Sequence, residues 1–524
     1  MSDSAGRHIP VLVVGGGATG LSAAVFLAWY GVPALLVERR PEPLDEPRAR
    51  ALHPRTMELY RAVGLEDAIR EVRSPIAGHD VIAHAETLAG PESLRLPHFL
   101  DADTGSLSPC RWATIDQNQL EPVLRDRAVS GGVDVRYATE VVAVDDRPDG
   151  VVALLRSRRT GHEQLVRADY LVAADGSHSP VRRMLGIGHD GPGTLARKVN
   201  VYFDADLREP LRGRRVILMT LRNPAVHGFL SPIDGMKRWR LAISLKPDQD
   251  TTISETQSVR LVRAAIGVDT LPIVIDRVSE VPWEISGRVT RRMCTGRVFV
   301  AGDAAHTMPP VGTFGVATGV QDAFNLAWKI GLHHRGLAGP GVLASYETER
   351  LPVAQHTTRL TAERYCLVNG GSGDARESAV RQRMTMFGYT YLAGALVPDD
   401  VTPHPVEDPD HPSGAPGTRA PHVPLAHDRG PISPTELIGR GFVLLTGSTG
   451  WERAAAEVAA RSGVRIDHYR IGDSLRDTTG AFHRRYGITD SGAVLMRPDG
   501  FIAWRTRTTD PDALAGVVDR VLFR

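Results

Sequence analysis

Three glycines near the N-terminus have the spacing of a dinucleotide-binding turn. Gly15, Gly17 and Gly20 form a G-x-G-x-x-G pattern between an apolar strand at 11–14 and a predicted helix that reaches about Tyr30. In such a turn the first glycine permits the bend, the second lets the backbone approach a pyrophosphate, and the third allows the helix to pack on the strand. The positive end of the helix then attracts the pyrophosphate.

An acidic residue at the end of the next predicted strand extends this motif. Glu38 follows the last motif glycine by 18 residues, near the spacing at which a carboxylate binds a ribose. Ala18 and Thr19 open the predicted helix, so their backbone amides belong to the same site. Arg39 and Arg40 come next, and they either read the 2′-phosphate of NADPH or are solvated surface charges. The unit therefore predicts a dinucleotide site.

Two later strands also end in acidic residues. Asp175 follows the apolar segment YLVAA, and Gly302 and Asp303 follow RVFVA. Because parallel strands of an α/β sheet present their carboxyl ends at one edge, these residues and Glu38 are expected to face one extended ligand.

The segment PPVGTFGVATGVQD, residues 309–322, predicts a helix N-terminus that faces a ligand. Thr318 and Gln321 fit a capping box, so the helix is expected to begin near Thr318. Just before it, the backbone amides of Gly315, Val316 and Ala317 would lie bare at the positive end of the helix dipole. A flat ligand that becomes anionic along one edge, such as a reduced isoalloxazine ring, would be stabilised there.

Together these motifs resemble the group A FAD-dependent aromatic hydroxylases of the para-hydroxybenzoate hydroxylase type, over roughly residues 8–370. The resemblance implies that the glycine motif and Glu38 hold the ADP part of FAD, and that Asp303 contacts its ribityl and pyrophosphate region. Asp175 is expected to support both FAD and NADPH. The resemblance also assigns single positions: Arg50 near the pyrophosphate, Gln117 at the ribityl chain, Val141 beside the adenine, and Pro310 with its carbonyl toward the reactive C4a edge. No side chain is assigned as an acid or base.

The rest of the chain narrows the resemblance. The segments DAFNLAWKIGLHHRGLAGPGVLASYETERLPVA and GAVLMRPDGFIAWR are similar to hydroxylases of bacterial aromatic polyketides, especially the anthracycline aklavinone hydroxylases. This similarity covers nearly the whole chain. One departure stands in the flavin loop, where Ala317 replaces an asparagine that is common in these enzymes, so a side-chain contact to the loop or the ring edge would be missing.

The predicted fold class is α/β of mixed type, with a Rossmann-like FAD-binding domain, a β-sheet substrate domain and a C-terminal thioredoxin-like domain. Phe203, His227, Phe229 and Trp239 are candidates to line a substrate cavity under the sheet. The C-terminal domain contains no cysteine, which excludes disulfide exchange. The expected boundaries are 1–77, 111–190 and 286–396 for the FAD-binding domain, 78–110 and 191–285 for the substrate domain, 397–436 for a linker, and 437–524 for the thioredoxin-like domain.

Composition narrows the possible partners. The chain has 62 Lys and Arg against 61 Asp and Glu, a formal net charge of +1, so a nucleic-acid partner is not expected. Its three cysteines have no metal-ligand spacing, so no metal is expected. The N-terminus lacks the pattern of a secretion signal, which favours a cytoplasmic protein without a membrane partner. A homodimer is possible.

The leading hypothesis is an FAD monooxygenase that uses NADPH and O₂ to hydroxylate an aromatic polyketide through a flavin C4a-hydroperoxide, in antibiotic biosynthesis. A second interpretation keeps the flavin and changes the outcome to Baeyer–Villiger oxygen insertion or to inactivation of a polyketide drug. A third, motivated by Ala317, is a binding protein that retains flavin without oxidising its ligand.

Overall fold

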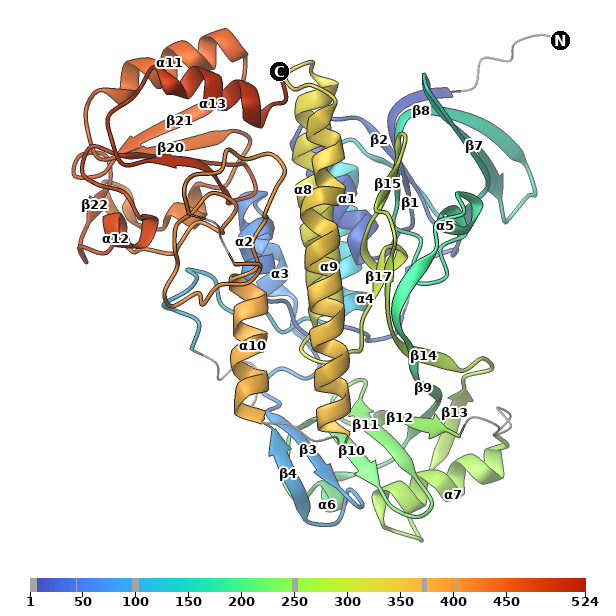
Figure 1. Ribbon diagram of the computed structural model, residues 1–524. Coiled ribbons are helices and arrows are strands. Elements are labelled where there is room, and N and C mark those ends of the chain that lie inside the picture. The colour runs from blue at the N-terminus through green and yellow to red at the C-terminus, as the bar shows by residue number, and fades with distance from the viewer. Residues whose placement is uncertain (1–6, 44, 97–102, 247–252, 370–374, 402–403) are drawn as a thin grey trace, which may run out of the picture.

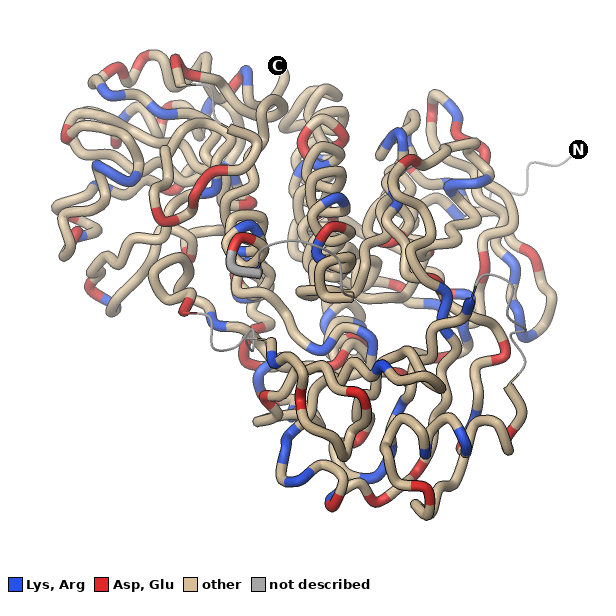
Figure 2. The backbone as a smooth tube through the Cα atoms, turned by 60° about the horizontal axis from the view of Figure 1, so that its bottom comes forward, with Lys and Arg blue, Asp and Glu red and all other residues tan. Residues whose placement is uncertain are grey.

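The computed structural model describes residues 7–43, 45–96, 103–246, 253–369, 375–401 and 404–524. These residues form the mixed α/β architecture that the sequence predicts, with two large sheets joined by long helices and a smaller sheet near the C-terminus (Figure 1). Figure 2 shows basic and acidic residues interspersed along the described chain. In that part of the chain no helix combines the length and the apolar character needed to cross a bilayer.

The first sheet contains the N-terminal strand-helix-strand unit. Its main strands run in the order β15-β16-β8-β1-β2-β5, and the pairs from β16 to β5 are parallel. The strands β1 and β2 are almost entirely apolar, as expected where a parallel sheet is covered on both faces. The strands are β1 (Arg7–Val14), β2 (Ala34–Val37), β5 (Asp134–Arg136), β6 (Thr139–Arg147), β7 (Gly150–Ser157), β8 (Glu163–Ala173), β15 (Cys294–Thr295) and β16 (Val298–Val300).

Helices cover this sheet, and the two longest extend toward the second one (Figure 1). Helix α1 is buried along most of its length and packs against α8 and α4, which explains why it is apolar on all sides. The helices of this region are α1 (Ala18–Trp29), α2 (Pro54–Ala62), α3 (Glu66–Glu71), α4 (Gln117–Ser130), α5 (Pro180–Met184), α8 (Phe314–His334), α9 (Gly341–Val368) and α10 (Ala375–Phe387), with a 3₁₀ turn, η2, at Gly302–Ala304.

The second sheet has the order β17-β14-β9-β12-β11-β10-β3-β4, with β13 paired to β9. Its elements are β3 (Val81–Ala85), β4 (Glu92–Leu96), β9 (His189–Asp204), β10 (Val216–Arg222), β11 (His227–Pro232), β12 (Arg238–Leu245), β13 (Val274–Val278), β14 (Trp283–Thr290) and β17 (His306–Thr307), with helices α6 (Arg208–Leu211) and α7 (Glu255–Ile266).

One face of this sheet packs on α7, and two of the predicted cavity residues lie there. Phe203 and Trp239 are each 1% exposed in a core that includes Val262 and Ile266 of α7. The prediction that these two aromatics line a substrate cavity is therefore wrong. Successive residues of a strand point to opposite faces of the sheet. Phe203 and Trp239 stand at positions that point to the face covered by α7.

The C-terminal sheet has the order β21-β20-β23-β24, with β20 and β21 parallel and the other two pairs antiparallel. This is the strand arrangement of a thioredoxin fold. Its elements are β20 (Phe442–Thr446), β21 (Ile466–Arg470), β23 (Ala493–Met496), β24 (Ile502–Thr506), α11 (Trp451–Ser462), α12 (Phe482–Tyr486) and α13 (Ala513–Val521).

The segment before this sheet, which composition predicts as a linker, is packed into the structure. Thr418 and Ala420 are fully buried, and Arg419 forms a buried ion pair with Glu58 of α2. Its short elements are β18 (Leu425–His427), β19 (Gly430–Ile432) and η3 (Pro434–Leu437), and β18 also pairs with β22 (Arg476–Asp477). The segment therefore joins the C-terminal sheet firmly to the first domain.

Candidate functional site

The glycine turn between β1 and α1 shows why its residue types are required. Gly15 has a φ of +112°, and a Cβ there would collide with the carbonyl of Ala174. A Cβ on Gly20 would collide with the carbonyl of Gly15. A Cβ on Gly17 would meet only the Glu121 carboxylate, at 3.7 Å. The outer two glycines thus serve close packing, and the middle one leaves open space beside its backbone.

The first turn of α1 presents backbone amides without a protein cap. Gly17 is the N-cap, no side chain caps this end, and the first turn carries no acidic residue. The amides of Ala18 and Thr19 are among those that an α-helix leaves unpaired at its N-terminus. They can bind a pyrophosphate, as the sequence predicts.

The side chain of Thr19 brings this turn against two other parts of the chain. A Cβ on Gly302 or on Gly319 of α8 would collide with the Thr19 hydroxyl. The start of α1, the η2 turn and the first part of α8 therefore touch one another through glycines. The structure thus brings the glycine turn against two motifs that lie about 300 residues later in the sequence.

Glu38 lies at the end of β2, where its carboxylate is already oriented. Its Oε2 accepts a hydrogen bond from the N–H of Gly16 at 2.7 Å, and its Oε1 accepts one from the N–H of Arg40 at 2.9 Å. Burial alone would raise the pKa of Glu38, but these backbone donors and the Arg40 guanidinium lower it. The carboxylate is therefore ionised and fixed, as a ribose-binding group should be.

A groove runs from this carboxylate toward β6 and α5. Gly15, Glu38, Arg39, Val141 and Asp175 all line it, so the structure brings together five of the predicted cofactor residues. Arg39 is exposed there, whereas Arg40 forms an ion pair with Glu38.

Asp175 uses both carboxylate oxygens within its own turn. They accept hydrogen bonds from the Ser179 hydroxyl at 2.5 Å and from the N–H of Val181 at 3.0 Å, which holds the start of α5 in place. Asp175 thus shapes one wall of the groove, in addition to lining it.

The η2 turn is held by an acidic residue that the sequence analysis missed. Asp322 of α8 is fully buried, and its Oδ2 accepts hydrogen bonds from the N–H of Gly302 at 3.1 Å and from Nε2 of His306 at 2.7 Å. Its Oδ1 binds Arg350 of α9 at 2.7 Å. Asp303 stays exposed beside this turn and lines a small pocket with His306. The signal for Asp322 was a carboxylate within a predicted helix whose other residues are mostly apolar.

Helix α8 begins at Phe314, four residues earlier than predicted. Thr318 and Gln321 are buried inside the helix and form no capping box; instead Thr313 is the N-cap, with a φ of +56°. Gly315 and Val316 therefore lie in the first turn with unpaired amides, as predicted. Ala317 lies one position further, where an α-helix pairs the amide internally, and its side chain is 1% exposed. The prediction of a bare amide at Ala317 is wrong.

The loop before α8 is held by a histidine that the sequence analysis also missed. Nε2 of His53 lies 2.6 Å from the carbonyl oxygen of Gly312, and its ring contacts those of Trp112 and Phe314 edge-on. Burial lowers the pKa of His53 to about 4, so the ring is neutral at pH 7 and its Nε2–H donates to the carbonyl. Pro310 is exposed in this loop, and apart from the adjoining helix backbone no atom lies within 4 Å of a Cβ placed on Gly315.

Two predicted residues near α4 are engaged with other side chains. Arg50 binds both carboxylate oxygens of Asp116, at 2.9 and 3.1 Å, and donates to the carbonyl of Pro232 in the second sheet at 2.7 Å. It therefore joins the start of α4 to the second sheet. Gln117 donates to Glu121 at 2.8 Å.

Glu121 is a further residue beside the glycine turn that the sequence analysis missed. It is 1% exposed, its Oε2 has no partner, and burial raises its pKa. A buried carboxyl with an unused oxygen next to Gly17 is suited to a hydroxyl of a bound ligand.

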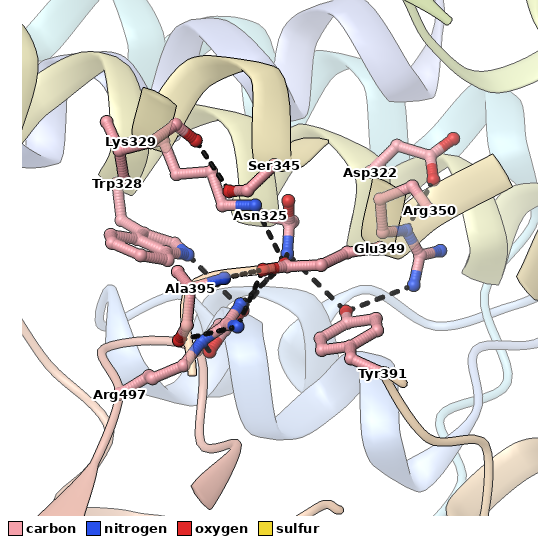
Figure 3. Close-up of polar contacts among 12 residues, drawn as sticks. Asp322, Asn325, Trp328, Lys329, Ser345, Glu349, Arg350, Tyr391, Ala395 and Arg497 are labelled. Carbon is pink, nitrogen blue, oxygen red and sulfur yellow. Dashed lines mark hydrogen bonds and ion pairs between the residues drawn. The ribbon is translucent and has the colours of Figure 1, made fainter. Parts of the chain in front are cut away.

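A buried ion network links the site to the C-terminal domain (Figure 3). Glu349 of α9 binds Lys329 of α8 and Arg497 of the β23–β24 turn, each at 2.7 Å. Arg497 also binds Asp499 at 2.6 Å, and Asp499 accepts from Nε1 of Trp328 at 3.2 Å. The C-terminal domain is thereby anchored to the helix whose N-terminus lies at the site.

These features fit one extended ligand of the FAD type. The groove beside Glu38 offers an ionised carboxylate to a ribose, the open first turn of α1 has donors for a pyrophosphate, and the bare start of α8 has donors for an anionic ring edge. Among the residues described here, no group of three His, Cys, Asp or Glu side chains is placed to hold a metal ion.

Comparison with known proteins supports this assignment. Residues 8–361 match a family model described as an FAD binding domain, and residues 413–524 match one described as the C-terminal part of an aromatic-ring hydroxylase. The chain is 37% identical to aklavinone 12-hydroxylase of Streptomyces purpurascens, over 99% of each protein. It is 38% identical to 4-methyl-5-nitrocatechol 5-monooxygenase of a Burkholderia species, over 98% of this chain and 96% of that one. A solved complex of aklavinone-11 hydroxylase with FAD and aklavinone aligns over 100% of both chains, with a TM-score of 0.91 and 36% identity.

Proposed function

The chain belongs to the FAD-dependent aromatic-ring hydroxylases, and from that premise we propose that it hydroxylates an aromatic polyketide with NADPH and O₂. Similarity to aklavinone hydroxylases over the full chain supports the substrate class. The relative named for a nitrocatechol is as similar in sequence, so enzymes at this level of identity also include ones that act on smaller phenols.

The observation that carries the proposal is the contact of Thr19 with Gly302 and Gly319. It brings the open N-terminus of α1, the η2 turn and the first part of α8 into contact, so one ligand that extends along the three elements can reach all of them. A dinucleotide with an attached redox ring is the ligand class that uses an acidic ribose contact, a pyrophosphate-binding helix end and a second helix end in this order.

When bound, FAD supplies the activation of O₂ with electrons from NADPH. The chain's own contribution is positioning and electrostatics. The unpaired amides of Gly315 and Val316, at the positive end of α8, stabilise negative charge on the adjacent ring edge. His53 fixes the carbonyl of Gly312, so that the loop before α8 keeps its shape. The second sheet contacts the first domain through Arg50 and Arg240, and a substrate bound between them would help to exclude water from the ring.

The chain has no second glycine-rich motif that could bind the nicotinamide nucleotide. We therefore propose that it binds transiently at the outer rim of the groove, near the exposed Arg39, and not in the part beside Glu38 that the FAD adenosine would occupy. Ala317, buried in α8, leaves the first-turn amides in place and supplies no polar side chain to the loop.

The test is turnover of the purified protein with an anthracyclinone polyphenol under ¹⁸O₂. The proposal predicts a yellow protein, faster NADPH oxidation when the polyphenol is added, and a product that gains one labelled oxygen on an aromatic ring. A labelled ester or lactone would instead support the Baeyer–Villiger interpretation. Bound flavin with no labelled product would contradict the proposed function.

A further inference from the structure

The second sheet presents a polar face opposite its α7 core. On β9, Val201 and Phe203 belong to the α7 core, and the strand alternates its side chains between the two faces. The residues between and before them, Lys198, Asn200 and Tyr202, therefore point the other way. Lys198 is in register with Ser244 of β12 and with Trp283 of β14. Arg240 of β12 is in register with Tyr202 and with Ser231 of β11. These positions therefore share one face.

This polar face is turned toward the first domain. Arg240 donates to the carbonyl of Pro47 at 3.1 Å, and Arg277 of β13 forms an ion pair with Glu46 at 2.8 Å. The segment 46–50, which contributes Arg50 to the same junction, thus lies against the face. A substrate held between the sheet and the site at α8 would meet the side chains of this face.

Lys198 is a buried cation on this face without a carboxylate. It is 4% exposed, and its Nζ donates to the Ser244 hydroxyl at 2.7 Å. No Asp or Glu of the described residues forms an ion pair with it, and burial alone lowers its pKa to about 8. The ammonium group therefore persists at neutral pH. Burying a charge without a counter-ion costs free energy. Such a charge therefore indicates an anionic partner that the chain itself does not supply.

A second cation and an aromatic ring stand beside it. Nζ of Lys198 lies 5.3 Å from the centre of the Phe229 ring, and the Arg240 guanidinium lies 5.7 Å from the same point. Nε of Arg240 is buried without a partner. The Trp283 ring meets Phe229 edge-on at 6.3 Å. Two cations with unused donors thus flank an aromatic surface.

We infer that Lys198, with Arg240 and Phe229, forms a subsite for an oxyanion borne on the aromatic substrate, either a phenolate or an arene carboxylate. This inference rests on the proposed function and specifies its substrate class. The anion supplies the missing counter-charge, and the Phe229 ring contacts the aromatic skeleton. Lys198 is a specificity-determining residue here, because a neutral analogue gains nothing from the ammonium group.

The test measures binding of three probes to the FAD-loaded enzyme by the change in flavin absorbance. The probes are 1,2-dihydroxyanthraquinone, its uncharged dimethyl ether, and anthraquinone-2-carboxylate. The variants are Lys198→Met, which keeps the apolar stem, and Lys198→Arg, which keeps the charge. Lys237→Met makes the same change at an exposed position of this domain and serves as the control.

Lys198→Met is expected to weaken binding of at least one anionic probe by about tenfold or more, equivalent to about 1.4 kcal/mol. Binding of the dimethyl ether should change less than about twofold, Lys198→Arg should recover most of the loss, and Lys237→Met should have no effect. The probe that depends on Lys198 identifies the oxyanion as phenolate or carboxylate.

Equal loss for all three probes would show a packing role and overturn the inference. No change for any probe, or no binding of any probe by the FAD-loaded wild type, would overturn it as well. The readout needs no turnover. Charge-selective binding without a labelled product would therefore reject the proposed function alone, and a labelled product without charge selectivity would reject this inference alone.

Discussion

The carboxylate of Asp322 accepts a hydrogen bond from the backbone N–H of Gly302, with 3.1 Å between Oδ2 and N. Through this bond the third turn of α8 fixes the turn that presents Asp303. The same carboxylate accepts a hydrogen bond from His306 on one oxygen and binds the Arg350 guanidinium with the other. A single buried acid thus sets the η2 turn against α8 and α9.

Replacing Asp322 with Asn should destabilise the protein strongly. The amide can still accept from Gly302, but buried Arg350 loses its counter-charge, and losing one partner of a buried ion pair costs about 3–5 kcal/mol. Urea unfolding measures the loss. Asp145→Asn, in an exposed pair with Arg147, is the control and should cost less than about 1 kcal/mol. Similar costs for the two variants would contradict the role of Asp322.

Replacing Gly315 with Ala tests the start of α8. Apart from the adjoining backbone of its own helix, no protein atom lies within 4 Å of the added Cβ, so the apoprotein should unfold at the same temperature or slightly higher. The methyl group points into space assigned to the ligand, and the dissociation constant for FAD should rise about tenfold or more. Gly516→Ala in α13 also has open space and should leave FAD binding unchanged. If FAD affinity is unaltered in both variants, the flavin does not bind at the start of α8.

The local motifs of the site were predictable because their signals are short. Gly15, Gly17 and Gly20 fit together within one turn, and Glu38 follows at a fixed distance, so each can be identified from its neighbours in sequence. The strands and helices of the C-terminal domain were recognised for the same reason. The sequence also predicts the α8 helix itself, with an error of four residues at its start.

The remaining parts depend on contacts between distant residues. His53 meets Gly312 across 259 positions of the chain, and nothing near either residue predicts this pair. The start of α8 was misplaced because Thr313 takes a left-handed conformation, which is uncommon for threonine. The prediction puts Phe203 and Trp239 on the wrong face of the sheet, because an aromatic side chain by itself does not show to which face of a strand it points.

Replacing Arg497 with Met tests the anchor of the C-terminal domain. Glu349 would retain Lys329 but lose its bidentate partner, and Asp499 would lose its ion pair. The expected cost is about 3–5 kcal/mol in urea unfolding, with faster proteolysis around the β23–β24 turn. The control is Arg465→Met in the same domain, where the Asp467 pair is largely exposed. If both variants unfold at the same urea concentration, the network does not anchor the domain.

Acid should weaken the protein through Glu349. Burial alone would raise the pKa of this carboxyl, but Arg497 and Lys329 outweigh it and lower the pKa to about 2. A lowered folded-state pKa gives stability that is present above the ordinary value of 4.5 and is lost as pH falls from 4.5 toward 2. Lys329 is charged throughout this pH range in the folded and the unfolded state, so it does not contribute to the pH dependence of stability. Urea unfolding at a series of pH values should show a loss of up to about 3 kcal/mol from this group, and Glu349→Gln should remove that part of the slope.

Raising the pH should weaken binding of anthraquinone-2-carboxylate through Lys198. The probe keeps its charge, whereas the Lys198 ammonium, with a pKa lowered to about 8 by burial, loses its proton above that value. The groups that face Lys198 do not titrate in this window: His227 on β11 has a lowered pKa and is already neutral, and Tyr202 on β9 has a raised pKa and stays neutral. Arg240 remains charged, and Trp283 on β14 carries no charge.

Wild-type affinity should therefore be constant below pH 7 and fall through pH 8 to 9. Lys198→Arg should hold its affinity across this range, because its guanidinium stays protonated. Lys198→Met should start weaker and show no such fall. A wild-type affinity that does not change between pH 7 and 10, measured on FAD-loaded enzyme by flavin absorbance, would show that the Lys198 ammonium does not face the bound anion.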